Sequence, residues 1–256
     1  MRVLSRFAKV NVVIVFLGFV AIPPPASAWD WNWGWGGNSV KGSGIVKTES
    51  RNVSGFSSIS VSIPANVIVV QGETEGVVLE GDDNILPLIE TVVDDRQLQI
   101  CFNEKNLSIR TSALKLIVSA KAVEGLSVAG AGDMHAARLR SATLKVRISG
   151  SGNTTIGNLD TDNLIVSVAG SGNFTAGGKA RNVETRIAGS GDMKIGKLEA
   201  STVKVSVAGS GDATVWAKES LTVSVAGSGD VKYYGDAKVS QSIAGSGSVK
   251  RLGAAP

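Results

Sequence analysis

One pattern fills the second half of this 256-residue chain, and its clearest copy reads Leu164-Ile165-Val166-Ser167-Val168-Ala169-Gly170-Ser171-Gly172-Asn173. Its core is Gly-Ser/Ala-Gly followed by Asp, Asn or Ser. This core occurs seven times, with its first glycine at Gly130, Gly150, Gly170, Gly189, Gly209, Gly227 and Gly245. A fixed period near 20 residues is typical of a solenoid, in which each copy is one unit stacked on the last.

Each copy has the alternation of a half-buried β-strand. Two residues before the first glycine the side chain is always β-branched: Val128, Ile148, Val168, Ile187, Val207, Val225 and Ile243. One position earlier it is polar: Ser127, Arg147, Ser167, Arg186, Ser206, Ser224 and Ser242. The pattern therefore predicts one buried strand face and one face exposed to water.

No copy shows helical periodicity, so the predicted fold is all-β. We predict a parallel β-helix with about seven rungs of about 20 residues, each made of a strand, a tight glycine turn and a second strand. This arrangement is favoured because the same residue type returns at each inward position, as vertical stacking requires. The alternative is an antiparallel meander folded into a sandwich, with the glycine turns as hairpins.

Residues 45–120 lack the glycine pattern but remain rich in β-forming sequence. Strands are predicted over residues 59–63, 67–71, 77–80, 88–93, 97–102 and 114–119. We expect them to form an irregular N-terminal cap over the edge of the first rung. The predicted β-helical domain then covers residues 45–253 as one unit.

The first 28 residues have the three parts of a secretory signal peptide. Arg2, Arg6 and Lys9 form a basic region, residues 10–22 are mainly apolar, and Ala26-Ser27-Ala28 is a small-residue cleavage site. We predict an exported protein located in the periplasm or at the cell surface. Cleavage leaves 23 Lys and Arg against 22 Asp and Glu, so no basic excess favours nucleic-acid binding.

Residues 29–44 would follow the signal peptide and are rich in Trp and Gly. The tryptophans Trp29, Trp31, Trp33 and Trp35 stand at every second position. This composition is typical of a flexible leader. In the alternative interpretation the four rings form an aromatic strip that contacts a membrane interface or stacks on sugars.

The chain has one Cys and one His, which excludes disulfide frameworks and multi-histidine metal sites. Cys101 lies on the polar face of its predicted strand with no base beside it, so we predict an inert thiol. We predict no catalytic residues and no cofactor.

Asp192, Asp212 and Asp230 follow the glycine turn in three successive copies. In a stack their carboxylates would form a row about 5 Å apart, which Ca²⁺ could neutralise. Asn153 and Asn173 interrupt the row, and the nonapeptide of calcium-binding β-rolls is missing. The predicted role is therefore hydrogen bonding to local backbone N–H groups, with a calcium site as the alternative.

An ordered set of segments is similar to one bacterial family. It includes Gly55-Phe56-Ser57-Ser58-Ile59, Val67-Ile68-Val69-Val70-Gln71-Gly72, the glycine array, and Gly-Ser-Gly-Asp-Val-Lys-Tyr-Tyr-Gly at residues 227–235. Over about residues 50–250 the chain resembles the exported head GIN domain family, which is labelled an autotransporter adhesin. The resemblance implies a β-helical, envelope-exposed domain with no established enzyme activity.

The function that the sequence favours is a non-catalytic binding or scaffold protein of the bacterial envelope. Its repetitive polar strand face would contact a glycan, a lipid surface or another protein. One alternative is a polysaccharide lyase or hydrolase on a β-helix, which would need convergent carboxylates. The other is a self-assembling homo-oligomer that pairs through the edge near residues 243–249.

Overall fold

The computed structural model describes residues 39–104, 107–111 and 114–256. Within these ranges the chain forms strands β1 to β18 and one short 3-10 helix, η1 (Leu86–Leu88). In the same ranges no helix is long and apolar enough to cross a membrane. The predicted signal peptide and Trp29, Trp31, Trp33 and Trp35 lie outside the described residues.

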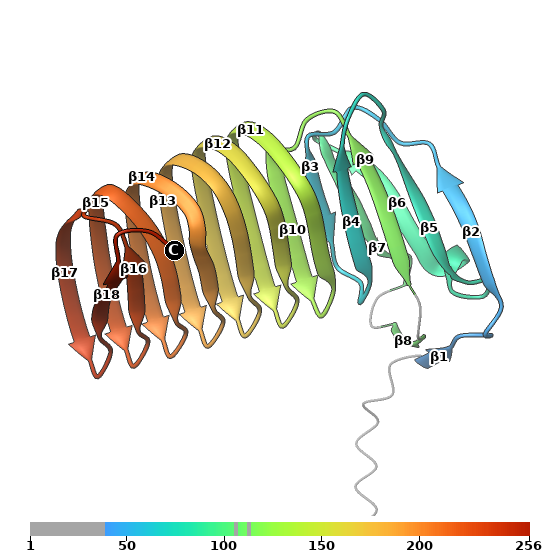
Figure 1. Cartoon of the computed structure of the whole chain (residues 1–256). Coiled ribbons are helices and arrows are strands. Elements are labelled where there is room, and N and C mark those ends of the chain that lie inside the picture. The colour runs from blue at the N-terminus through green and yellow to red at the C-terminus, as the bar shows by residue number, and fades with distance from the viewer. Residues whose placement is uncertain (1–38, 105–106, 112–113) are drawn as a thin grey trace, which may run out of the picture. The chain divides into compact units, whose positions relative to one another are not determined.

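Residues 125–253 form a β-solenoid of about six turns (Figure 1). Its central strands are β11 (Asp133–Gly150), β12 (Thr154–Gly170), β13 (Phe174–Gly189), β14 (Met193–Gly209) and β15 (Ala213–Gly227). Each pairs with the next in parallel, and equivalent residues of the repeat lie side by side. This pairing confirms the predicted β-helix and excludes the antiparallel meander.

One long strand joins each glycine turn to the next, and it bends midway, so that a rung consists of a turn and a bent strand. We call the half after the turn the first limb and the half that leads to the next turn the second limb. In β12, Ile156 and Leu159 of the first limb and Val166 and Val168 of the second are at most 1% exposed. The core is therefore the space between the two limbs.

The glycine turns are stacked by backbone hydrogen bonds. The N–H groups of Ser171 and Gly172 both donate to the carbonyl oxygen of Gly150 in the previous turn, at 2.9 Å each. Gly170 has φ +116°, which side chains rarely adopt, and a Cβ on Gly172 would overlap the carbonyl oxygen of Gly152. The first glycine of the tripeptide is needed for its positive φ, and the second is needed because the backbone of the previous turn lies too close for a side chain.

The stack ends in shorter strands at the C-terminal side. The first limb continues through β16 (Val231–Tyr234) to β18 (Val249–Gly253). The second limb ends at β17 (Lys238–Gly245), which pairs in parallel with β15. The two limbs therefore finish on different strands.

Two partial rungs extend the stack at the N-terminal side. The strands β3 (Ser58–Val61) and β4 (Asn66–Gln71) pair in parallel with β10 (Gly125–Gly130) and β11. Beyond them lie β7 (Gln97–Phe102) and β9 (Lys115–Ala120), again in parallel. The rungs are therefore not stacked in chain order, because β3 and β4 lie between strands that come later.

Antiparallel strands close this end. The strand β5 (Gly76–Asp82) pairs with β9, β6 (Ile89–Asp94) pairs with β7, and β2 (Val46–Arg51) pairs with β5. A separate short pair joins β1 (Ser39–Lys41) to β8 (Ser108–Arg110). The irregular, β-rich N-terminal region is as predicted, although β1, β2 and β8 were not expected.

Candidate functional site

The outward side of the second limb carries the predicted polar pattern. We call it the serine face, and its central column is Ser127, Arg147, Ser167, Arg186, Ser206 and Ser224. These residues lie side by side on successive strands. An exposed ion pair of 2.6 Å joins Arg186 to Glu184, and Lys204 lies 3.6 Å from the same carboxylate.

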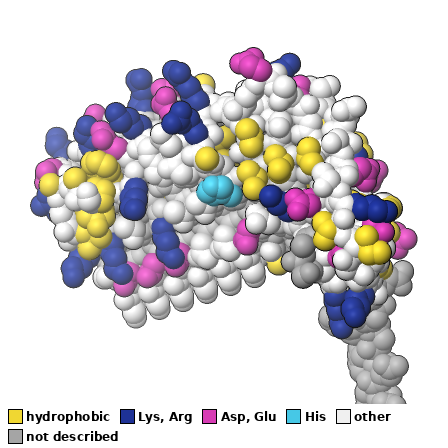
Figure 2. All heavy atoms as spheres, turned by 45° about the vertical axis from the view of Figure 1, so that its right-hand side comes forward, with side chains coloured by type: hydrophobic (Ala, Val, Ile, Leu, Met, Phe, Trp, Pro, Cys, Tyr) yellow, Lys and Arg dark blue, Asp and Glu magenta, His cyan; other side chains and the backbone are white. Residues whose placement is uncertain are grey.

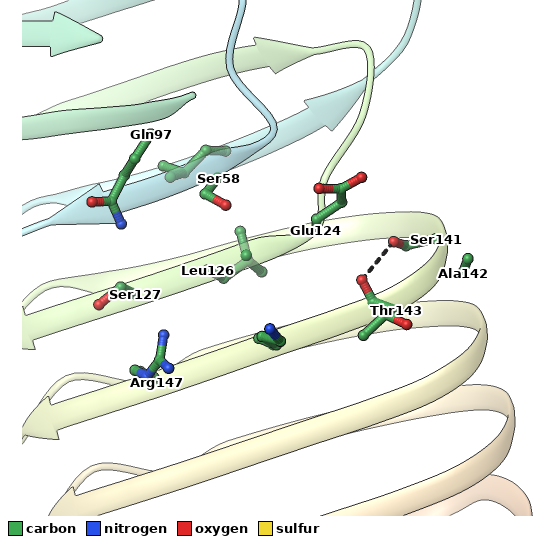
Figure 3. A pocket seen from close by; sticks show the side chains of 12 residues that line it. Ser58, Gln97, Glu124, Leu126, Ser127, Ser141, Ala142, Thr143 and Arg147 are labelled. Carbon is green, nitrogen blue, oxygen red and sulfur yellow. Dashed lines mark hydrogen bonds between the residues drawn. The ribbon is translucent and has the colours of Figure 1, made fainter. Parts of the chain in front are cut away.

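A polar groove of about 350 Å³ opens on the serine face, where β10 meets β3 and the bend of β11 (Figure 3). It forms because the chain reaches β10 from β9 through residues 121–124, and not through the bend of a preceding rung. Gln97, Ser58 and Glu124 line the side toward β7 and β3, and Thr143 and Arg147 of β11 line the opposite side. The groove is thus lined by hydrogen-bond donors and acceptors and by both acidic and basic side chains.

The bends between the limbs form a charged ridge, visible as mixed acidic and basic side chains along the top of the repeat region in Figure 2. Ion pairs join neighbouring rungs there: Arg140–Asp160 at 3.5 Å, Arg181–Asp162 at 3.5 Å and Lys218–Glu199 at 2.8 Å. The hydrogen bond from Lys218 lowers the pKa of Glu199. Such exposed pairs stabilise the fold by little, so the ridge is mainly a solvated surface.

The outward side of the first limb is the face seen in Figure 2, with His135 at its centre. Hydrophobic side chains gather to either side of the histidine. On one side, Ile68 of β4 is in register with Ile117 of β9, which is in register with Val78 of β5. Val70, which lies two residues after Ile68, is also exposed.

On the other side of this face, Trp216 of β15 and Tyr234 of β16 are register neighbours, and both are half-buried. The Tyr234 ring reaches back over Gly196, since a Cβ there would lie 3.4 Å from its Cε2 atom. The Trp216 Cδ1 atom would be equally close to a Cβ on Gly235. We call these two residues the aromatic pair.

Sequence reasoning did not single out the aromatic pair, although the repeat contains the signal. Both residues stand seven positions after the first glycine of their copies. The equivalent positions in earlier copies hold small residues: Ala137, Gly157, Gly177 and Gly196. A change from glycine to Trp and Tyr in one outward column would have identified the pair.

The Asp and Asn residues after the glycine turns form a ladder between rungs. Asp192 Oδ1 accepts a hydrogen bond from the Asp212 N–H at 3.3 Å, and Asp212 Oδ1 accepts one from the Asp230 N–H at 2.8 Å. Asn153 and Asn173 act in the same way. The N–H groups that these side chains accept therefore belong to the next rung, and the prediction of local N–H partners was wrong. Both Asp and Asn can fill the position, because each has an oxygen that accepts this hydrogen bond.

The last carboxylate of the ladder has two donors. The Ser248 hydroxyl donates to Asp230 Oδ1 at 2.7 Å and the Ser248 N–H at 2.9 Å. These hydrogen bonds lower the pKa of Asp230. In the described ranges no three His, Cys, Asp or Glu side chains gather as a metal site.

Cys101 on β7 is half-buried, on the side of the strand predicted from the alternation. Burial raises the pKa of its thiol, and the charge of Glu90 raises it further. The thiol therefore stays protonated at neutral pH, which disfavours reactivity as a nucleophile.

Comparison with known proteins gives a family and several solved relatives. The model of the family described as "Putative auto-transporter adhesin, head GIN domain" matches residues 55–237. A crystal structure of a "putative adhesin" from Bacteroides fragilis is 28% identical, has a TM-score of 0.80, and covers 83% of this chain and 100% of its own. No curated protein matches.

Two further solved structures share the fold at lower identity. A "putative lipid binding protein" from Parabacteroides distasonis has a TM-score of 0.72 at 24% identity, covering 84% of this chain and 99% of its own. A "putative adhesin" from Parabacteroides merdae has a TM-score of 0.67 at 21% identity, with 84% and 99% covered.

Proposed function

This chain belongs to the head GIN domain family, described as "Putative auto-transporter adhesin, head GIN domain", and from that premise we propose that it is an exported, non-catalytic binding module of the cell envelope. The ligand in this proposal is a glycan or another envelope component, held on the outer faces of the solenoid. The site of action is the periplasm or the cell surface, reached through the signal peptide predicted over residues 1–28.

The observation that carries the proposal is the regular serine face with its groove. Polar side chains, either Ser or Arg, recur on successive rungs about 4.8 Å apart, on strands whose inward side chains are buried in the core. A rigid face loses little conformational entropy when it binds. Repeated hydroxyl and guanidinium groups suit a ligand that is itself repetitive and rich in hydroxyl groups.

The aromatic pair adds a second contact region on the first limb. Trp and Tyr rings combine an apolar surface with a polar group and are common where a ligand has both. In the described part of the chain the Tyr234 hydroxyl and the Trp216 indole N–H have no hydrogen bond. Both groups are therefore available to a ligand.

An enzymatic function has less support. The family description, "Putative auto-transporter adhesin, head GIN domain", names no enzyme activity. The carboxylates that a lyase or hydrolase would use, Asp192, Asp212 and Asp230, accept backbone N–H groups of the next rung. Turnover of a polysaccharide that is lost on replacing one of them would revive the enzyme alternative.

The experiment is a binding screen of residues 29–256 against a glycan array and against anionic and neutral vesicles. We expect a ligand whose affinity falls several-fold in Arg147→Ala and in Trp216→Ala. Arg140→Ala, an exposed arginine of the charged ridge, is the matched control and should leave the affinity unchanged. A second protein that begins at residue 39 tests whether Trp29, Trp31, Trp33 and Trp35 contribute.

Two results would contradict the proposal. One is that no arm of the screen shows binding. The other is that the ligand binds equally well to the wild type and to the Arg147 and Trp216 variants, which would place the contact away from both outer faces.

A further inference from the structure

We propose that the chain forms a two-fold symmetric dimer, in which β17 pairs antiparallel with β17 of a second copy. The inference goes beyond ligand binding and concerns the C-terminal end of the stack. It rests on the exposure of that end, on the different construction of the N-terminal end, and on the sequence of β17.

The core is open along β17. In β15, the inward residues Leu221, Val223 and Val225 are at most 1% exposed. Their register partners on β17 are Val239, Gln241 and Ile243. Val239 and Ile243 are each 38% exposed, because a rung covers them on one side only. The outer edge of β17 also has no strand partner among the described residues.

The first limb at the same end is covered by a charged side chain. Arg251 of β18 is in register with the inward-facing Tyr233. Its Nε atom donates to the carbonyl oxygen of Gly235 at 2.9 Å, and its guanidinium pairs with Asp236. At this end the edge strand β18 therefore has a charged side chain at an inward position, whereas the inward positions of β17 carry none.

The N-terminal end has two edge strands, β6 in the column of the second limb and β2 in the column of the first limb, and β2 carries inward-pointing charges. On the edge strand β2, the residues that face the core are Lys47, Glu49 and Arg51, in register with Gly81, Leu79 and Val77. Arg51 pairs with Glu49 at 2.6 Å and donates to the carbonyl oxygens of Leu86 and Ile89. Inward-pointing charges on an edge strand oppose pairing with another chain.

This difference between the ends selects the symmetry. Head-to-tail stacking would place β17 against β6 and, at the same time, β18 against the charged β2, and it would continue indefinitely. A contact between two C-terminal ends uses the same strand twice and closes after two copies. In this dimer the sheet would run from β15 to β17 of one copy and then to β17 and β15 of the second copy.

The sequence of β17 is self-complementary about Gln241. With Gln241 opposite Gln241 of the second copy, Val239 lies opposite Ile243 and Ser240 opposite Ser242. Lys238, the charged residue of this strand, then lies opposite Ala244, so that no like charges meet.

Gln241 explains the choice of register. The equivalent inward positions in other rungs are Leu126, Val146, Val166, Thr185, Val205 and Val223. An amide in this column needs a partner once it is covered, and a second amide supplies both a donor and an acceptor. A single polar residue in an apolar interface can fix the register and the number of chains.

Cysteine crosslinking of residues 29–256 in a Cys101→Ser background tests the register. Opposed residues of an antiparallel pair have Cα atoms about 4.5–5.5 Å apart, within disulfide reach. We therefore expect Gln241→Cys to give a covalent dimer under mild oxidation. Lys238→Cys is the matched control on the same strand, and its two copies would lie six residues apart in register, so it should stay monomeric.

Sedimentation tests the interface without a crosslink. We expect a concentration-dependent dimer whose dissociation constant rises at least tenfold in Ile243→Lys. Ser242→Lys, on the outward side of the same strand, should associate like the wild type, with thermal melts of both variants as the folding control. A monomer at every concentration, or equal crosslinking of the Gln241 and Lys238 variants, would overturn the proposal. Neither result bears on ligand binding by the outer faces.

Discussion

Replacing Gly170 by alanine should destabilise the solenoid strongly, because the new methyl group would strike the backbone of the previous rung. The Cβ would lie 2.5 Å from the carbonyl oxygen of Gly150, and relief to an ordinary contact requires a movement of about 0.9 Å. That oxygen accepts two hydrogen bonds, from the N–H groups of Ser171 and Gly172. Overpacking of this kind costs about 1–3 kcal/mol.

The backbone conformation adds a second cost. Gly170 has φ +116°, and an L residue with positive φ costs roughly 1–2 kcal/mol. The two effects together predict a loss of about 3 kcal/mol in the free energy of unfolding. The assay is urea denaturation of residues 29–256 followed by circular dichroism, with wild type and variant at equal concentration.

Two other glycines separate the contributions. Gly55 has φ +79°, but no atom lies within 4 Å of the position that an added methyl group would take, so Gly55→Ala should show the conformational cost alone, about 1 kcal/mol. Gly72 has neither a positive φ nor a close neighbour, so Gly72→Ala should be neutral or slightly stabilising. If Gly170→Ala loses no more stability than Gly55→Ala, the argument that the rungs stack through close glycine contacts is refuted.

Three further predictions concern the ladder and the thiol. Hydrogen bonds from Ser248 hold the pKa of Asp230 below the value of about 3.9 in an unfolded chain. The stability from this shift is therefore present above about pH 4 and lost as the pH falls through the lowered value. Asp230→Asn keeps an oxygen acceptor but does not titrate. The difference in urea midpoint between this variant and the wild type should therefore change between pH 5 and pH 2. A difference independent of pH would count against the stabilisation of the Asp230 carboxylate by Ser248. Because the ladder carboxylates accept backbone N–H groups, adding Ca²⁺ or EDTA should leave the melting temperature unchanged, whereas a rise of several degrees with Ca²⁺ would favour the calcium alternative. Cys101 should react slowly with a thiol reagent at pH 8, and faster in Glu90→Gln, since the Glu90 charge raises the thiol pKa; equal rates would exclude that influence.

The repeat region could be predicted from sequence because its determinants are local and repeated. Alternation at Val166 and Val168 shows which side is buried, and seven copies show that like residues lie on like residues. The bent strand was not predicted, since the residues between the limbs, such as Asp160 and Asp162, look like a turn. In the structure they continue the strand and pair across rungs.

The N-terminal stacking order could not be predicted in this way. The strand β4 pairs with β9 and with β11, so residues near Val67 touch chain that is about 50 and 70 residues away. Alternation identifies the buried face of each strand and contains no information about which distant strand covers it. Pairing of this kind is decided by the final packing, which a short sequence window does not reveal.

The same stacking that makes the fold predictable also limits where function can reside. An inward position such as Val168 is enclosed by two rungs, and Gly172 touches the backbone of the previous one, so neither can change without disturbing the column. Outward positions of the second limb are not enclosed in this way, and the central column of the serine face, with Ser127, Arg147 and Ser167 on successive strands, shows that they vary within one chain. In the proposed binding function, specificity must therefore come from a few outward columns, so that two proteins with identical cores could bind different ligands.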